Sequence, residues 1–191
     1  MQKLLLAITV SLVSASAMAQ DKGWYVGGAL GQGTAKGFCN GLPGGTTTCD
    51  DTDTTVKALG GYQVSRNFAI EFGAMNAGTV EARGPLGRLT VETAIAEVTP
   101  VAILPVGETF SVFGKFGLYT SAVETKLSGV FNSTERTTNS DLTFGVGASW
   151  VFMPRFALRA EWQRYSKVDA GGDMDKSDAD VISLGLVYRF F

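Results

Sequence analysis

The sequence contains no histidine among its 191 residues, and only 18% of the residues are charged. The lack of histidine excludes Ser-His-Asp and Cys-His nucleophiles and removes the usual ligand of zinc, copper and haem. Average soluble domains carry about 25% charged residues. A formal net charge of −2 disfavours a nucleic-acid partner, which needs a basic surface. We therefore predict a non-enzymatic protein without a cofactor.

Long hydrophobic runs are also missing after the first twenty residues, so helical membrane spans are not expected. The start of the chain carries Lys3, a short apolar core over residues 4–13, and small residues at Ala17 and Ala19. This pattern predicts a secretory signal peptide over residues 1–19. The apolar core is too short for a membrane span of roughly 20 residues. Residues 20–191 are expected to form one domain after export.

Only two cysteines are present, Cys39 and Cys49. In the oxidising compartment that a signal peptide implies, we expect them to form a disulfide that staples a loop. So short a loop gains less than about 3 kcal/mol from the bond. The alternative is a redox-active or partner-linking pair.

Glycine is abundant instead, with 24 residues, and large apolar residues alternate with small ones. Near the end of the chain, Ile182, Leu184 and Leu186 occupy even positions, while Ser183 and Gly185 lie between them. A period of two is typical of β-strands. The same pattern predicts eight strands, at about residues 23–33, 55–64, 68–77, 88–104, 109–125, 140–152, 156–166 and 179–191.

The connections between these strands alternate strictly between short and long. The short ones are residues 65–67, 105–108 and 153–155, and the long polar ones are residues 34–54, 78–87, 126–139 and 167–178. In an antiparallel up-and-down barrel, this order places all short turns at one end and all long loops at the other. We therefore predict an all-β, eight-stranded antiparallel barrel.

The large apolar face of the strands decides what surrounds the barrel. An eight-stranded lumen is just wide enough for ordinary side chains, so the many aromatic rings do not fit inside, as a soluble lipocalin-like barrel would require. Turned outward, they need a bilayer, where barrel closure satisfies the backbone groups. Rings beside the short turns and the chain end predict an aromatic girdle. They are Tyr62, Phe68, Phe110, Phe152, Phe156, Tyr188 and Phe190.

Charged residues within the strands fall on the opposite, small-residue face. A mid-strand Arg or Lys turned toward lipid costs on the order of 2–4 kcal/mol, so we predict that these residues form an ionic network in the lumen. They are Glu71, Lys115, Arg159, Glu161 and Arg189. Such a network either plugs the lumen as paired charges or lines a narrow conductive path. We favour the plug, because eight strands leave little room in the lumen.

Five segments resemble the transmembrane domain of the OmpA family and its small OmpX-like relatives. They are residues 23–27 (GWYVG), 60–64 (GGYQV), 69–73 (AIEFG), 158–162 (LRAEW) and 183–190 (SLGLVYRF). The resemblance implies an eight-stranded barrel in the outer membrane of a Gram-negative bacterium. It also implies contacts with outer-membrane lipids and lipopolysaccharide, and with the barrel-assembly machinery. Host-surface or phage ligands are expected at the long loops.

Family features carry over only at matching positions. Glu71 and Arg159 match two members of the family's interior ionic gate, whereas Ser149 and Val101 stand at the positions of its other carboxylate and its lysine. The gate is therefore not expected to be intact. The assembly signal at the end of family barrels falls on Tyr188 and on one of two phenylalanines, Phe190 or Phe191.

The chain ends there, so the periplasmic peptidoglycan-binding domain of OmpA itself is not expected. These features favour a structural outer-membrane barrel that displays surface loops for envelope integrity or adhesion. The alternative is a narrow porin-like channel for ions or small solutes.

Overall fold

The computed structural model describes residues 22–35, 48–50, 52–84, 87–129, 133–168 and 177–190. They form eight long strands and one short one. The strands are β1 (Gly23–Ala35), β2 (Thr48–Asp50), β3 (Thr52–Ser65), β4 (Phe68–Gly84), β5 (Gly87–Val106), β6 (Phe110–Gly129), β7 (Ser133–Met153), β8 (Phe156–Val168) and β9 (Ser177–Arg189). No helix in these ranges is long and apolar enough to cross a membrane. The expected signal peptide, Cys39 and Phe191 lie outside the described residues.

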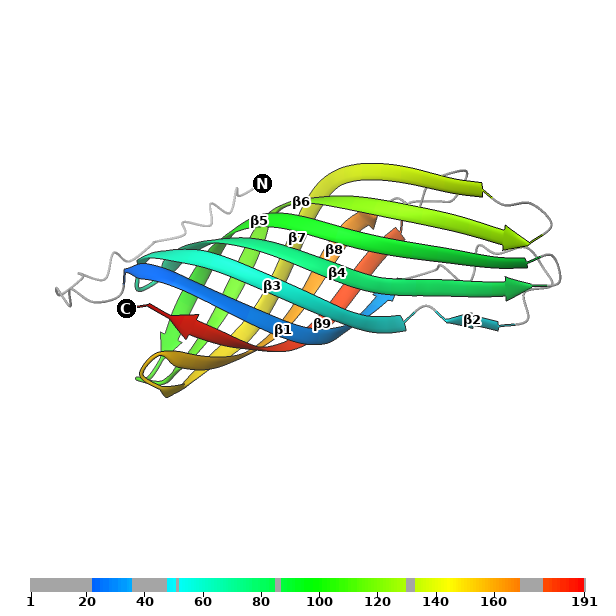
Figure 1. The fold of residues 1–191 in the computed structure, drawn as a ribbon. Coiled ribbons are helices and arrows are strands. Elements are labelled where there is room, and N and C mark those ends of the chain that lie inside the picture. Colours follow the sequence, from blue (N-terminus) through cyan, green and yellow to red (C-terminus); the bar gives the residue numbers. More distant parts are fainter. Residues whose placement is uncertain are drawn as a thin grey trace, which may run out of the picture.

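The eight long strands close into an antiparallel barrel (Figure 1). Each strand pairs with its neighbours in sequence, and β1 pairs both with β3 and with the last strand, β9. The turns at residues 66–67, 107–109 and 154–155 lie at one end of the barrel. Gly107, with φ of 86°, adopts the left-handed conformation that glycine tolerates best. The predicted up-and-down barrel and its short turns are confirmed.

The opposite end of the barrel differs from the sequence prediction. Residues 78–87 and 126–139 were expected to be loops, but β4 pairs with β5 up to Gly84 and Gly87, and β6 pairs with β7 up to Leu127 and Ser133. These polar stretches lack the apolar alternation of the membrane-spanning strands because water can solvate both faces of a sheet outside the bilayer. The strand β2 also adds to β4, with Thr48 opposite Arg83.

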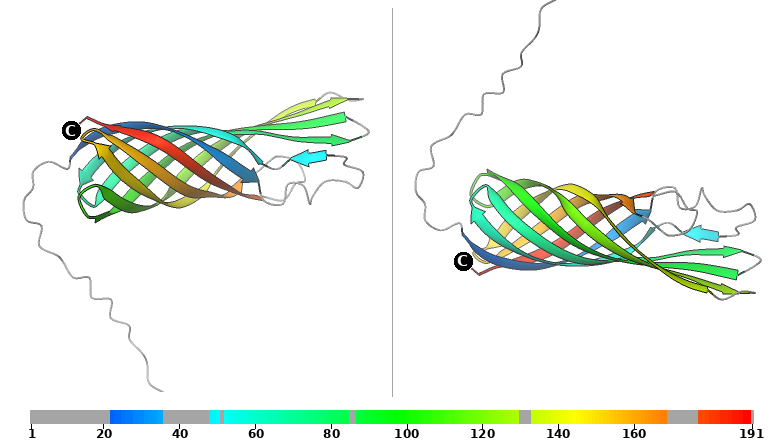
Figure 2. Two further views of the ribbon diagram at one scale, coloured as in Figure 1. Left: turned by 90° about the horizontal axis from the view of Figure 1, so that it is seen from below. Right: turned by 90° about the horizontal axis from the view of Figure 1, so that it is seen from above.

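We call the part of β4 to β7 beyond the barrel the surface extension; it comprises residues 79–84, 87–92, 124–129 and 133–136. Figure 2 shows the described strands of the extension projecting from one side of the barrel, whereas β8, β9 and β1 end closer to the short-turn end. Within the part of the chain that the structure describes, the surface extension is therefore a wall on one side of the barrel mouth.

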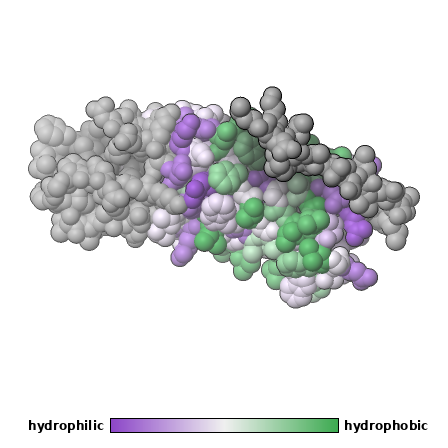
Figure 3. Space-filling model, turned by 180° about the vertical axis from the view of Figure 1, so that it is seen from behind, coloured by the Kyte–Doolittle hydropathy of each residue, from purple (hydrophilic) through white to green (hydrophobic). Residues whose placement is uncertain are grey.

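The outer surface of the barrel carries the large apolar side chains. Exposed fractions reach 67% for Ile182, 61% for Trp24 and 61% for Leu184. Figure 3 shows hydrophobic residues over the middle of the visible face, with hydrophilic residues on both sides of them. Soluble proteins rarely expose so large an apolar surface, and a bilayer accommodates it. The predicted outward face is confirmed.

Aromatic side chains at the short-turn end pack against one another around the barrel. The ring centroids of Phe152 and Phe156 are 6.4 Å apart, those of Phe156 and Tyr188 are 5.1 Å apart, and those of Tyr188 and Phe190 are 5.0 Å apart. Trp24 and Tyr62 form a further edge-to-face pair at 5.1 Å. These contacts form part of a girdle of amphipathic rings, the arrangement typical of a membrane–water interface.

Candidate functional site

The lumen contains a buried ionic network at mid-height, contributed by five strands. Because strand residues alternate between the two faces, the inward positions of β3, β4, β5, β6 and β8 project toward one another across the narrow barrel. Three cations and three carboxylates meet there, each at most 8% exposed. They are Lys57, Lys115, Arg159, Glu71, Glu97 and Glu161.

Glu161 is the centre of this network. Its Oε1 lies 3.0 Å from Nζ of Lys57 and 2.5 Å from Nζ of Lys115. Its Oε2 accepts a hydrogen bond of 2.8 Å from Nη2 of Arg159. Glu97 Oε1 lies 2.8 Å from Nζ of Lys57 and 3.3 Å from Nζ of Lys115. Each lysine is thus shared between two carboxylates, which offsets the desolvation that burial costs the charges.

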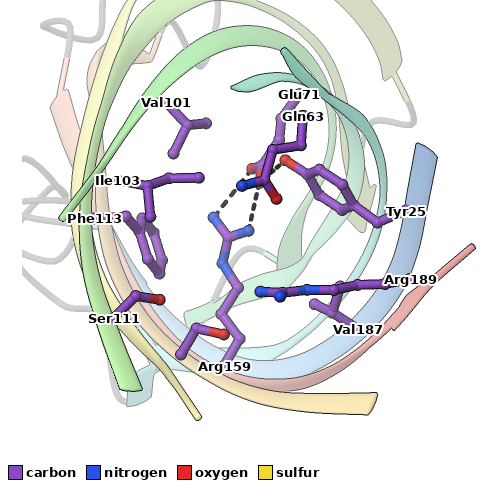
Figure 4. A pocket seen from close by; sticks show the side chains of 11 residues that line it. Tyr25, Gln63, Glu71, Val101, Ile103, Ser111, Phe113, Arg159, Val187 and Arg189 are labelled. Carbon is purple, nitrogen blue, oxygen red and sulfur yellow. Dashed lines mark hydrogen bonds and ion pairs between the residues drawn. The ribbon is translucent and has the colours of Figure 1, made fainter. Parts of the chain in front are cut away.

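Arg159 joins this cluster to Glu71 on the opposite wall (Figure 4). Its Nη1 donates to Glu71 Oε1, and its Nη2 donates to Glu71 Oε2 at 3.0 Å. The hydroxyl of Tyr25 donates a second hydrogen bond to Glu71 Oε1 at 2.7 Å. The guanidinium also lies 3.9 Å from the ring centroid of Phe113. This two-pronged geometry fixes the orientation of Arg159 across the lumen.

Neutral side chains continue the network toward the loop end. Gln163 Nε2 donates to Glu97 Oε2 at 2.6 Å and to Thr143 Oγ1 at 2.8 Å. Gln163 Oε1 accepts a hydrogen bond of 2.7 Å from Lys57 Nζ. The hydroxyl of Tyr165 donates to Glu97 Oε2 at 2.7 Å. Both oxygens of Glu97 therefore have partners, as buried polar groups require.

The structure brings four of the five predicted lumen residues into this network: Glu71, Lys115, Arg159 and Glu161. The fifth, Arg189, lies near the short-turn end and lines a cavity there. Val101 and Ser149 contribute no charge at the two remaining gate positions. The lysines of the network come from β3 and β6, and its further carboxylates come from β5 and β8.

The sequence prediction missed two charged members, Lys57 and Glu97. A signal for both was present, since Lys57 shares the parity of Leu59 and Gln63 in β3, and Glu97 shares that of Thr99 in β5. Continuing the inward parity to the loop-side end of each predicted strand would have found them.

The structure describes only part of the two other predicted sites, the disulfide and the assembly signal. Cys49 lies in β2, but Cys39 is outside the described residues, so the disulfide stays a prediction. Tyr188 and Phe190 belong to the aromatic girdle, and Phe191 is outside the described residues. The assembly signal therefore also stays a prediction.

The profile of the OmpA-like transmembrane domain matches residues 19–191. The chain belongs to the OmpA-like transmembrane domain family. This OmpA-like barrel lies in the outer membrane of a Gram-negative bacterium. A search of curated proteins gives no match.

Solved structures show the same fold at low sequence identity. Neisserial surface protein A is 13% identical, with 87% of this chain and 97% of that chain covered and a TM-score of 0.63. OprG from Pseudomonas aeruginosa is 15% identical, with 88% and 97% covered and a TM-score of 0.61. The attachment invasion locus protein Ail of Yersinia pestis, in complex with the heparin analogue sucrose octasulfate, is 15% identical, with 89% and 99% covered and a TM-score of 0.58.

Proposed function

We propose that this OmpA-like barrel is a sealed structural element of the outer membrane, without enzymatic activity, that displays a surface for contacts outside the cell. The buried ionic network carries this proposal. A continuous aqueous path past Glu161 requires the separation of contacts of 2.5 to 3.0 Å between its carboxylate and three cations. Breaking a buried ion pair costs about 3–5 kcal/mol, so the closed state predominates.

Conductance in planar bilayers tests the seal. We expect the refolded protein to give only small, rare openings, and large steady currents on the scale of a porin would refute the proposal. Replacement of Glu161 by Gln (E161Q) leaves the three cations with fewer partners, so its openings should be more frequent. The exposed turn residue Glu108 offers a matched control, because E108Q removes the same charge outside the lumen.

A narrow channel for ions or small solutes is the alternative function. It requires the network to open without a substitution, under voltage alone. Regular voltage-dependent openings of the unsubstituted protein, with the same current as those of E161Q, would favour the channel over the sealed barrel.

The surface extension supports the display function. Its paired strands carry charged residues of both signs at fixed register positions: the like-charged Arg83 and Arg88 are opposite each other, whereas Glu81, Thr90 and Lys126 form one row. A paired sheet holds such groups at fixed spacing, which suits recognition of a host surface or a phage. The mixed signs give no specific reason to assign to this chain the sulfated ligand of the Ail structure.

Shortening the surface extension tests the display function. Replacing residues 79–92 with a two-residue hairpin turn removes the outer parts of β4 and β5 and leaves their membrane-facing parts. We expect the shortened barrel to fold and to lose binding to host cells or phage, with unchanged bilayer conductance. Undiminished binding would refute display by this extension. We also propose that the barrel contacts lipopolysaccharide and the barrel-assembly machinery.

A further inference from the structure

The outer face of β4 to β7 changes in composition toward the loop end. One row of register neighbours on this face is apolar, with exposed fractions of 38% to 58%: Phe72, Val98, Leu118 and Leu142. The next two rows toward the loop end carry small or polar side chains: first Ala74, Ala96, Thr120 and Ser140, then Asn76, Ala94, Ala122 and Thr138. The apolar row suits hydrocarbon, and the two rows beyond it suit the interface with water.

A groove of about 410 Å³ lies over the second of these small-residue rows. Typical ligand pockets measure about 300–1,000 Å³. The groove is lined by Asn76, Ala94, Ala122 and Thr138, and on its loop-end side by Glu92 and Glu124. These six residues share the outward parity of their strands, so the groove opens on the outer face of the sheet rather than into the lumen. We call it the headgroup groove.

The headgroup groove combines an apolar floor with polar groups on its sides. Ala94 and Ala122 are opposite each other in its middle, between the carboxamide of Asn76 and the hydroxyl of Thr138. The row on the loop-end side places Glu92 opposite Glu124, and Glu124 opposite Arg136. Hydroxyl, carboxamide and carboxylate groups exchange hydrogen bonds with the hydroxyls of a sugar, while a small apolar floor accommodates the C–H face of a sugar ring.

The height of the headgroup groove indicates where its ligand comes from. Asn76 lies four residues beyond Phe72 in β4, or about 13 Å along the strand. With a strand tilt of about 40°, this is about 10 Å along the membrane normal. The groove is therefore continuous with the lipid-facing surface and lies in the headgroup layer of the leaflet outside the cell. In the outer membrane of a Gram-negative bacterium, that layer consists of the sugars of lipopolysaccharide.

We propose that the headgroup groove binds the glucosamine disaccharide of lipopolysaccharide. This inference rests on the proposed contact with lipopolysaccharide and assigns that contact to one site. A sugar ring lies on Ala94 and Ala122, and its hydroxyls bond Asn76, Thr138 and the carboxylates. The acyl chains of the same molecule pack on the apolar row below, at Phe72 and Leu118. A single ligand thus covers both the polar and the apolar part of this face.

NMR of alanine methyl groups tests the proposal on the mature barrel in phosphatidylcholine nanodiscs. The methyl resonances of Ala94 and Ala122 are followed as the mole fraction of lipid A rises, with phosphatidylglycerol as the anionic lipid without a sugar disaccharide. We expect a saturable shift with lipid A and none with phosphatidylglycerol. A122W fills the groove, so the mole fraction of lipid A at half saturation of the Ala94 shift should rise at least tenfold.

Ala160 provides the matched control, because it is exposed on the outer face of β8, away from the groove. A160W makes the same substitution and should leave the Ala94 titration unchanged. If A122W does not fold, T138V takes its place; it keeps the size of the side chain and removes a hydroxyl, and the expected rise is about threefold.

The result also separates this site from the general contact with lipopolysaccharide. If lipid A shifts the outer-face methyls of Ala148 and Ala160 but not that of Ala94, the groove is wrong and the general contact stands. If lipid A shifts none of them, both fail. An equal shift with phosphatidylglycerol, or equal effects of A122W and A160W, would also overturn the site.

Discussion

Removal of the carboxylate charge at Glu161 should strongly destabilise the barrel. The side chain contacts three cations, with distances of 3.0 Å to Lys57, 2.5 Å to Lys115 and 2.8 Å to Arg159. At an effective dielectric constant of about 20, each such contact is worth roughly 5–7 kcal/mol before desolvation is counted. Desolvation removes most of this sum, and loss of one partner from a buried ion cluster typically costs about 3–5 kcal/mol. We expect a loss in that range for E161Q.

Urea unfolding of the refolded protein in phospholipid vesicles measures this loss. Trp24 and Trp150 are 61% and 50% exposed on the outer surface, so their fluorescence reports transfer from lipid to water. The control E108Q alters an exposed turn and should change the free energy of unfolding by less than about 0.5 kcal/mol. Adding K115M to E161Q removes a cation left with one partner fewer, so the double variant should be more stable than the sum of the two single losses predicts. If E161Q unfolds within 0.5 kcal/mol of the parent, the network does not hold the barrel as argued.

Three further predictions concern the lipid-facing surface of the barrel, the close contacts of one glycine and the pair of cysteines. L184R places a charge on the outer face and should cost about 2–4 kcal/mol in the same unfolding assay; a loss near zero would mean that this face is not in lipid. G185A should cost about 1–3 kcal/mol, because a Cβ there lies 2.6 Å from the carbonyl oxygen of Gly28, whereas G60A meets nothing within 4 Å and should be nearly neutral. Non-reducing mass spectrometry of the exported protein should show Cys39 and Cys49 bonded, with both hydrogens lost, and two free thiols would contradict the staple.

The membrane-spanning part of the fold could be predicted from the sequence because lipid imposes one rule on every strand. Outward positions must be apolar, and inward positions must carry small side chains or charges that are paired with opposite charges. The residue types at Ile182 and Ser183 therefore indicate which of them faces lipid and which faces the lumen. The surface extension follows no such rule. Water solvates polar groups on both faces of a sheet, so the sequence of this part does not alternate between apolar and polar residues. The pairing of Thr90 with Glu81 and Lys126 therefore could not be distinguished from a loop by sequence periodicity.

The ionic network was only partly predictable for a different reason. Parity assigns Glu71 and Arg159 to the lumen, but it does not give their height along the barrel, which depends on the register between neighbouring strands. Lys57 and Glu161 are 104 residues apart in the chain, and their Nζ–Oε1 distance of 3.0 Å results from the tilt and stagger of the closed sheet. Contacts across a lumen thus require the three-dimensional structure, even where every participant can be identified.

The one-sided wall formed by β4 to β7 has a consequence for how the molecule can change. The backbone of that wall continues beyond the part of the barrel whose outer face is apolar, so hydrocarbon does not require apolar residues at its positions. The embedded cylinder has no such freedom, since lipid constrains its exterior and ion pairing constrains its interior. The amino-acid sequence of the surface extension can therefore change under selection by extracellular partners, while the sequence of the membrane-spanning strands is conserved by these constraints.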